Sequence, residues 1–311
     1  MHRNLKSRID DDYEVVCVVS AGNVVGESAV WCDRQKSLFW VDIGAKRIHQ
    51  LTPLSGRHQT WDVPDFPTSI GLCQSDNYVL GLRHDVVIWN GADEFAVLAT
   101  PEPAIPENRL NEGRVGPDGC FWVGTMQDNL NQDGSLKEMN KDSGAIYRVH
   151  PSGQIDRMTA NAFGITNTFI WQTAQPQQFV TADTLQNQLY QYDYSLTSGE
   201  ISNRQPFTAP FDRGLPDGSC LDAEGYIWNC RVAGGGCVVR FSPAGEVDRV
   251  LDLPCSWPTS CAFGGDGLRT LFVTSARIGL RTSDIEANPI EGGLLAVDVC
   301  VPGVQEWRFA D

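Results

Sequence analysis

A short polar stretch stands directly before an apolar run at residues 107–126, which read ENRLNEGRVGPDGCFWVGTM. The turn formers that a connecting loop needs are already supplied by the glycine, proline and aspartate residues within it. Arg109, Asn111 and Glu112 are additional to that requirement. These three side chains must therefore either brace the loop or meet a ligand that approaches it.

Three further polar residues lie next to apolar runs far apart in the chain. They are Glu27 in GESAVW, Asn167 in GITNTFIW and Asp217 in GLPDGSCLDAEGYIW. Taken singly, Glu27 is typical of an exposed turn acid, and Asp217 fits a type I turn. A buried Asn167 must find partners for its amide, either by capping a turn or by binding an ion. Both interpretations of each residue stay open at this level.

The elements that would position these residues follow a repeat. Six segments share one plan, in which a short aromatic or β-branched run is followed by a polar turn and a second strand. They start near residues 38, 78, 121, 179, 227 and 271. This spacing is the scale of one four-stranded propeller blade. A two-sheet sandwich is the alternative, but six similar units without long helical patterns favour a closed ring. We therefore predict an all-β, six-bladed β-propeller, in which inner strand ends converge on a central channel.

The ends of the chain are expected to close this ring. The strand YEVVCVV (13–19) has no hairpin partner nearby, and neither has VQEWRF (304–309). We predict that both join one blade, which removes an exposed sheet edge. Residues 1–12 are predicted to be a flexible tail and 13–311 a single domain. The polar insertion at 127–144 is expected to form a flap over one face.

Composition narrows the partners and the location. The 311 residues include 24 Lys and Arg against 39 Asp and Glu, a net charge of −15, which argues against a nucleic-acid partner. No apolar run approaches the roughly 20 residues that span a bilayer, so no membrane is expected. The 10 cysteines form no CxxC pair, and the first residues do not resemble a secretory signal. We expect reduced thiols and a cytoplasmic protein.

In order along the chain, the four motifs resemble those of the SMP-30/gluconolactonase/LRE family, which comprises regucalcin-like proteins and bacterial sugar lactonases. The family's Gly-Glu-Gly-Pro motif corresponds to GESAVW, and its Asn-Asp-Gly motif to NRLNEGRVGPDGCFWVGTM. Its Ser-Asn-Gly motif corresponds to ITNTFIW, and its Pro-Asp-Gly motif to LPDGSCLDAEGYIW. The resemblance runs from about Glu27 to the final strands. It implies the same six-bladed propeller that the repeat predicts.

The resemblance also implies roles for individual residues. One divalent cation would be held by Glu27, Asn167 and Asp217. The side chains of Arg109 and Asn111 would contact the hydroxyls or the ester of a sugar lactone.

Four positions within these motifs depart from the family's pattern, and one further acid agrees with it. Ser28 and Ala29 replace Gly-Pro, and Thr168 replaces the glycine after the asparagine, so the local backbone is expected to differ. Glu112 stands where aspartate is usual, and we expect it to contact substrate and to shift the substrate's position. Asp183 in VTADT stands where the family often has an acid near the channel, and we expect it to support the ligands from behind.

The chemistry that this ligand set implies is metal-assisted ester hydrolysis. Two carboxylates and an amide oxygen make a site for Ca²⁺, Mg²⁺ or Mn²⁺, and Zn²⁺ or Fe²⁺ can also use it. A divalent ion would polarise the lactone carbonyl, and Asp217 would accept a proton from the attacking water. Arg109 and Asn111 would orient the ring. The expected reaction converts an aldonolactone to its aldonic acid in sugar-acid catabolism.

Two other classes of function remain open. One is a non-enzymatic, Ca²⁺-binding regulatory propeller, and the other is an esterase for a non-sugar substrate such as a phosphotriester or an aryl ester. Serine-based hydrolysis is disfavoured because GESAV is not a G-x-S-x-G elbow. The sequence also shows no pattern that would pair a cysteine with one of the five histidines for catalysis.

Overall fold

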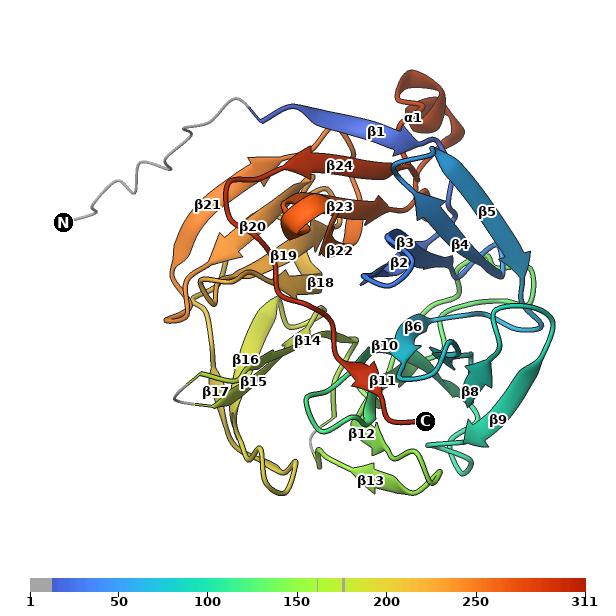
Figure 1. The fold of residues 1–311 in the computed structure, drawn as a ribbon, viewed down its shortest axis with the longest axis vertical. Coiled ribbons are helices and arrows are strands. Elements are labelled where there is room, and N and C mark those ends of the chain that lie inside the picture. Colours follow the sequence, from blue (N-terminus) through green and yellow to red (C-terminus); the bar gives the residue numbers. More distant parts are fainter. Residues whose placement is uncertain (1–12, 161, 175–176) are drawn as a thin grey trace.

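The computed structural model describes residues 13–160, 162–174 and 177–311. Six sheets, antiparallel except where β25 (Arg308–Phe309) joins one of them, surround a common centre in the described chain, as Figure 1 shows. The predicted all-β, six-bladed propeller is therefore confirmed. The tail predicted at residues 1–12 lies outside the described residues.

Each blade is built from consecutive strands, and the first of them lies next to the centre. Blade 1 comprises β2 (Gly26–Cys32), β3 (Ser37–Asp42), β4 (Arg47–Thr52) and β5 (Arg57–Asp62). Blade 2 comprises β6 (Ser69–Cys73), β7 (Tyr78–Gly81), β8 (Val86–Trp89) and β9 (Phe95–Ala99). Blade 3 comprises β10 (Asn108–Val115), β11 (Phe121–Gln127), β12 (Ile146–Val149) and β13 (Ile155–Arg157).

The other three blades follow the same order. Blade 4 comprises β14 (Thr166–Gln172), β15 (Gln178–Asp183), β16 (Gln188–Tyr194) and β17 (Ile201–Pro206). Blade 5 comprises β18 (Leu215–Leu221), β19 (Ile227–Val232), β20 (Cys237–Phe241) and β21 (Val247–Asp252). Blade 6 comprises β22 (Pro258–Gly264), β23 (Thr270–Ser275) and β24 (Leu294–Asp298), with β1 (Val15–Val19) at its outer edge. Short helical turns lie at η1 (Asp266–Leu268) and α1 (Thr282–Ala287).

The six predicted start points each lie within one residue of the first residue of a blade's second strand. These second strands are β3, β7, β11, β15, β19 and β23. These strands lack the polar alternation of a half-exposed sheet because neighbouring blades cover both of their faces. In β3, for example, all of Ser37–Asp42 is buried. The fully buried Trp40, Trp122 and Trp228 lie on such strands and fill the space between blades. Inter-blade packing therefore explains the repeat in the sequence.

Ring closure follows the prediction at the N-terminus, where β1 pairs antiparallel with β24 and so joins the two ends of the fold. The expectation that 304–309 would share that blade is wrong. Only β25 (Arg308–Phe309) forms a strand there, and it pairs in parallel with β6 of blade 2. The reason is that β1 already occupies the edge beside β24. An ion pair of 2.5 Å between Arg308 and Asp33 stabilises β25 in this position beside β6.

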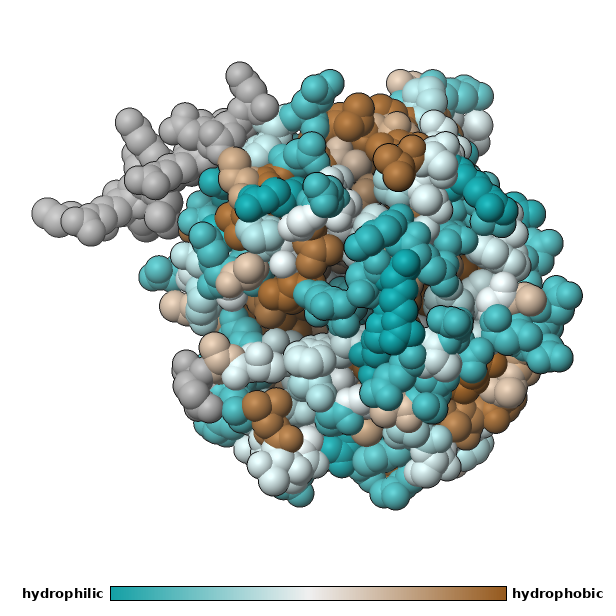
Figure 2. Space-filling model, viewed as in Figure 1, coloured by the Kyte–Doolittle hydropathy of each residue, from teal (hydrophilic) through white to brown (hydrophobic). Residues whose placement is uncertain are grey.

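The C-terminal segment, residues 299–311, crosses the middle of the ring between β24 and β25 (Figure 1). It covers the carboxyl ends of inner strands, since the Val304 N–H donates to the Leu221 carbonyl at 3.3 Å. Glu306 forms an ion pair of 3.2 Å with Arg114 near the end of β10. Figure 2 shows this face, where hydrophilic side chains gather over the centre of the ring and brown ones form smaller groups. One end of the central channel is thus closed by the chain itself.

Two further observations concern the length of the helices and the state of the cysteines. No helix among the described residues is long and apolar enough to cross a membrane. All ten cysteines are free, and eight of them are buried. Buried free cysteines behave as small apolar residues in such cores.

Candidate metal and substrate site

A backbone irregularity at the same place in four inner strands positions the polar residues. The pairing of β2, β10, β14 and β18 with their neighbours shifts register near the start of each strand. Such bulges turn side chains away from the sheet surface. Four predicted residues lie at or beside these bulges: Glu27, Asn111, Asn167 and Asp217. Together with Arg109 they line one cavity of about 260 Å³.

The cavity lies at the starts of the inner strands, so it is at the opposite end of the channel from the C-terminal segment. At its floor the buried Arg109 guanidinium donates to Asn111 Oδ1 at 2.8 Å. It also donates twice to Asn129 Oδ1, at 2.9 and 3.1 Å. Asn111 Nδ2 in turn donates to the Thr166 carbonyl at 2.9 Å. The pair is therefore held rigidly before any ligand arrives.

Asn167 presents its amide oxygen to this floor because its amide nitrogen is bound elsewhere. The Nδ2 group donates to Thr184 Oγ1 at 2.8 Å, and the Thr184 hydroxyl donates to the Pro216 carbonyl at 2.8 Å. Thr184 thus connects the Asn167 side chain to the backbone directly before Asp217. The sequence did not indicate Thr184, whose neighbour Asp183 drew attention instead.

Replacing Thr184 with valine is expected to lower the affinity for divalent ions by about 10- to 100-fold, as loss of a residue that orients a ligand commonly does. Valine keeps the shape of the side chain but cannot accept the Asn167 N–H, so the amide oxygen keeps only the Asn111 Nδ2 donor, at 3.3 Å, to direct it. Calorimetric titration with Ca²⁺ and Mn²⁺ would measure the change. Thr184→Ser should restore the affinity, and Thr208→Val, at a buried threonine elsewhere, should leave it unaltered. Wild-type affinity in Thr184→Val would contradict this role.

The two acids at the floor, Glu27 and Asp217, feel the charge of the nearby Arg109 but also that of Glu112. Glu27 Oε2 accepts the Ser28 N–H at 3.1 Å. Neither Glu27 nor Asp217 forms an ion pair with any residue that the structure describes. Burial and the nearby Glu112 charge raise the pKa of Glu27 to about 8. Burial together with the charges of Glu27 and Glu112 raises the pKa of Asp217 well above its ordinary value.

A divalent ion would offset this concentration of negative charge. No group of three or more His, Cys, Asp and Glu side chains in the described parts of the chain is arranged as a metal site. The candidate site instead offers two carboxylates and one oriented amide oxygen. Hard ions such as Ca²⁺ and Mg²⁺ take carboxylate and amide oxygens and complete their shell with water. The donor set therefore fits such an ion.

The two departures from glycine noted in the sequence have a visible consequence. Ser28 has a φ of 53° and Thr168 a φ of 58°, in the left-handed region that favours glycine. Each is held there by hydrogen bonds to a neighbouring blade. Ser28 Oγ accepts the Ile70 N–H at 2.9 Å, and Thr168 Oγ1 donates to the Asp217 carbonyl at 2.5 Å. The backbone follows the path of a glycine, and the hydroxyls add contacts between blades.

Glu112 does not line the cavity, although it lies close enough for its charge to act on Glu27 and Asp217. Asn111 and Glu112 are the two residues within the register shift of β10, and the cavity is lined by Asn111 but not by Glu112. Glu112 lines a separate void of about 10 Å³, near Arg114 and Glu306 and toward the C-terminal segment. Burial raises its pKa to about 7, although Arg114 opposes this. Glu112 therefore lines this void and is not among the residues that line the cavity, and its predicted contact with a substrate stays a prediction.

Asp183 also lies outside the cavity, and its carboxylate accepts backbone N–H groups. Its donors include Gly164 at 3.0 Å and Leu185 at 3.2 Å. Asp42, at the corresponding end of β3, accepts the N–H groups of Val24 and Val25 at 3.0 Å in the same manner. Both acids hold the loops that enter and leave an inner strand. The role of Asp183 in supporting the metal ligands from behind stays a prediction.

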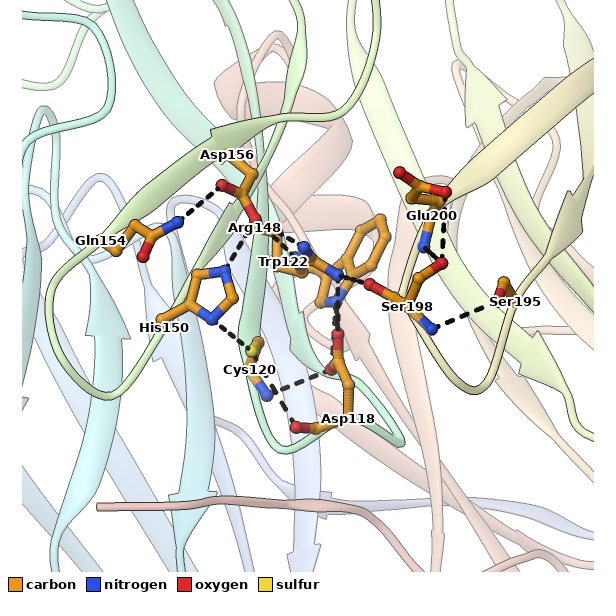
Figure 3. Close-up of polar contacts among 10 residues, drawn as sticks. All are labelled: Asp118, Cys120, Trp122, Arg148, His150, Gln154, Asp156, Ser195, Ser198 and Glu200. Carbon is orange, nitrogen blue, oxygen red and sulfur yellow. Dashed lines mark hydrogen bonds and ion pairs between the residues drawn. The ribbon is translucent and has the colours of Figure 1, made fainter.

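A second polar cluster, on blade 3, contains a cysteine–histidine contact that the sequence did not reveal (Figure 3). Cys120 Sγ lies 3.5 Å from His150 Nδ1, and His150 Nε2 lies 2.7 Å from Asp156 Oδ2. Cys120 is only 5% exposed, and burial and the Asp118 charge raise its pKa to about 12. Such a thiol is a poor nucleophile.

The same cluster links two blades. Arg148 pairs with Asp156 at 2.5 Å and donates to the Ser198 carbonyl at 2.8 Å, in the connection between β16 and β17 (Figure 3). Asp118 accepts the Trp122 indole N–H at 3.2 Å. We interpret the cluster as a brace between blades 3 and 4.

Comparison with known proteins is consistent with this geometry. A family model described as the SMP-30/gluconolactonase/LRE-like region matches residues 25–277. A 6-deoxy-6-sulfogluconolactonase from Pseudomonas putida is 32% identical over 94% of this chain and 98% of its own. Regucalcin from Bos taurus is 31% identical over 95% and 98%. The crystal structure of a calcium-binding regucalcin from Agrobacterium tumefaciens superposes with a TM-score of 0.87 at 25% identity, covering 96% of this chain and 98% of that one.

Proposed function

The chain belongs to the SMP-30/gluconolactonase/LRE-like family, and on that premise we propose that it hydrolyses a lactone of the sugar-lactone class in a reaction that depends on a divalent ion. One observation carries the proposal. Two carboxylates, neither of them in an ion pair within the described residues, and an oriented amide oxygen converge in the same cavity as the Arg109–Asn111 pair. A propeller that served only as a scaffold would not need these groups at its centre.

Glu27, Asn167 and Asp217 would hold the ion, whose chemical contribution is Lewis acidity at the ester carbonyl. Their oxygens come from blades 1, 4 and 5, which are fixed by inter-blade packing. Rigid placement matters because misplacement of the reacting groups by about 1 Å can cost about 100-fold in rate.

The residues of the chain divide the remaining work. Water adds to the carbonyl carbon and the ring C–O bond breaks, while Asp217 accepts the water proton at a carboxylate oxygen and returns it to the departing ring oxygen. The Arg109 guanidinium, next to Asn111 at the floor, stabilises negative charge on the substrate and orients the ring. The product is an open-chain hydroxy acid, an aldonic acid when the substrate is an aldonolactone.

The names of the relatives support this class of reaction and also define its alternative. The Pseudomonas putida relative is a sulfogluconolactonase, whereas the Agrobacterium tumefaciens structure is described as a calcium-binding protein. Binding of Ca²⁺ without turnover is therefore the second candidate function.

Proton release distinguishes the two. Chelator-treated protein would be mixed with glucono-, galactono- and xylono-lactones in a pH-stat, with and without Ca²⁺, Mn²⁺, Mg²⁺ or Zn²⁺. Acid production that requires both protein and ion supports the lactonase. Stoichiometric ion binding without acid production would support the calcium-binding alternative.

Ion affinity is expected to increase between pH 6 and pH 8. Because Glu27 has a pKa of about 8 and Asp217 a raised pKa in the ion-free protein, an ion must displace protons at lower pH. Each displaced proton gives about a tenfold rise in affinity per pH unit. The difference in Tm between loaded and chelated protein should grow by on the order of 5 °C over this range. An affinity that is independent of pH would show that Glu27 and Asp217 do not carry protons in the ion-free protein.

The same pKa shift determines whether the stability of the chelated protein rises or falls with pH. The folded state retains a proton on Glu27 between the ordinary pKa of 4.5 and about 8, while the unfolded chain has lost it. The stabilising contribution is therefore complete below pH 4.5 and disappears as the pH rises through 8. Chelated protein should melt at a lower temperature at pH 8 than at pH 6.

A further inference from the structure

Two of the proposed ligands lie at register shifts, where an inner strand loses part of its backbone pairing. The pairing of β14 with β15 is interrupted between Asn167 and Ile170, and that of β18 with β19 between Pro216 and Ser219. Backbone groups inside such a bulge are left without ladder partners. Asn167 and Asp217 are buried, so their carbonyl groups need donors from elsewhere.

The hydroxyl of Thr168 supplies such a donor to Asp217. Thr168 directly follows Asn167 in β14, and its Oγ1 donates to the Asp217 carbonyl on β18 at 2.5 Å. These two strands are the innermost strands of the adjacent blades 4 and 5 (Figure 1). Thr168 is 0% exposed, so water does not compete for this bond. A residue next to one proposed ligand therefore holds the backbone of the other.

Two further buried side chains fix the position of this hydroxyl. Thr168 Oγ1 lies 2.8 Å from Ser219 Oγ, and Asn229 Nδ2 lies 3.3 Å from Thr168 Oγ1. The same Asn229 nitrogen lies 3.0 Å from the Asp217 carbonyl oxygen and 3.0 Å from Ser219 Oγ. Asn229 is held in turn, because its Oδ1 accepts an Arg231 N–H at 3.3 Å. The cluster thus joins β14, β18 and β19 around the bulge that carries Asp217.

Thr184 joins the same two ligands a second time. It accepts the Asn167 side-chain N–H and donates to the Pro216 carbonyl, directly before Asp217. The Asn167 and Asp217 bulges are therefore connected by two separate hydroxyl groups, one on each side of β14.

Glu27 belongs to a different set of contacts. The Thr259 hydroxyl of blade 6 donates to the Gly26 carbonyl, and the Ile70 N–H of blade 2 donates to Ser28 Oγ at 2.9 Å. These bonds connect blade 1 to its own neighbours rather than to blades 4 and 5. The proposed ion site is therefore assembled from two parts, Asn167 with Asp217 and Glu27 alone.

From these contacts we propose that Thr168 is a positioning residue, whose hydroxyl joins Asn167 and Asp217 into one preformed part of the ion site. The inference rests on the proposed function, but only on its ion-binding residues and not on turnover. Without the hydroxyl, the Asp217 carbonyl loses one donor and keeps Asn229, so the bulge gains freedom. An ion would then have to order its own ligands, which lowers affinity.

Removing the hydroxyl while keeping the shape of the side chain tests the proposal. In Thr168→Val we expect the dissociation constant for Mn²⁺, measured by electron paramagnetic resonance of the free ion, to rise by about 10-fold. Thr168→Ser should restore the affinity, because serine keeps the donor. The matched control is Thr68→Val in blade 2, where Thr68 is 2% exposed and donates to the Gly81 carbonyl at 3.2 Å.

Stability separates positioning from a general structural role. Each valine removes one buried hydroxyl-to-carbonyl hydrogen bond, so both variants should lower the Tm of chelated protein by a similar small amount. Only Thr168→Val should also weaken Mn²⁺ binding, since blade 2 carries none of the proposed ligands. Wild-type affinity in Thr168→Val, or an equal loss of affinity in Thr68→Val, would overturn the inference.

A double-mutant cycle tests whether Thr168 acts through Asp217. Once Asp217→Ala has removed that ligand, Thr168→Val should lose most of its effect on Mn²⁺ affinity. In Glu27→Ala, the ligand of the other part, Thr168→Val should still weaken binding by about 10-fold. Full additivity of Thr168→Val with Asp217→Ala would reject the positioning role.

Ion binding and turnover together separate this inference from the proposed function. If Thr168→Val weakens Mn²⁺ binding while the wild-type protein hydrolyses no lactone, the lactonase is rejected and the positioning role is supported. If the wild-type protein hydrolyses lactones and Thr168→Val binds Mn²⁺ as tightly as wild type, the lactonase is supported and the positioning role is overturned.

Discussion

Replacing Asp217 with asparagine is expected to lower kcat/KM for lactone hydrolysis by roughly 10³-fold or more. The substitution keeps the size of the side chain but removes a proposed ligand charge and the proposed proton acceptor. Because Asp217 carries two roles, its loss should reduce both ion affinity and kcat. Titration calorimetry and steady-state kinetics at saturating ion would separate the two effects.

The matched control lies in the second Pro-Asp-Gly of the chain. Asp118 occupies the same local motif but accepts hydrogen bonds from Cys120 and Trp122 on blade 3, away from the cavity. Asp118→Asn should retain the activity of the folded fraction. If Asp217→Asn kept more than a tenth of the wild-type kcat/KM, the role of Asp217 in proton transfer would be wrong.

Replacing Glu27 with glutamine is expected to have opposite effects on function and stability. Loss of this carboxylate should weaken ion binding by about 100-fold or more and abolish lactonase activity at micromolar ion. In the chelated protein, however, Glu27 is a poorly solvated acid next to Asp217 and Glu112. Its neutral replacement should raise the Tm of chelated protein at pH 8 by on the order of 5 °C.

The pH dependence makes this prediction specific. At pH 4, below the ordinary glutamate pKa of 4.5, both proteins are neutral at this position and should melt at similar temperatures. Glu107→Gln, at an exposed glutamate near the start of β10, should change neither ion binding nor Tm by a measurable amount. A Glu27→Gln protein that is less stable than wild type at pH 8 without ions would show that the carboxylate is satisfied by the fold itself.

The sequence predicted most of the features that recur in every blade, but few of the features that occur at one place only. The second strands could be found because burial on both faces makes each a continuous apolar run, as in SLFWVD of β3. The C-terminal segment could not be placed, because its course depends on β1 already occupying the edge of blade 6. Which of two distant strands pairs with an edge depends on both, so the sequence of neither strand alone indicates the outcome.

The candidate site shows the same division. Glu27, Asn167 and Asp217 could be singled out because each interrupts or precedes an apolar run. The place of Glu112 next to Asn111 in the chain predicts a contact with substrate, yet at the bulge of β10 Glu112 lines a separate void. Thr184 acts through the direction of one N–H bond of Asn167, a detail that only three-dimensional geometry reveals.

The most direct test of a single central ion is anomalous scattering from crystals soaked in Mn²⁺. The account predicts one strong peak at the floor of the cavity, with oxygens of Glu27, Asn167 and Asp217 about 2.1–2.5 Å from it. An empty floor, or a peak that these three side chains do not contact, would contradict the account.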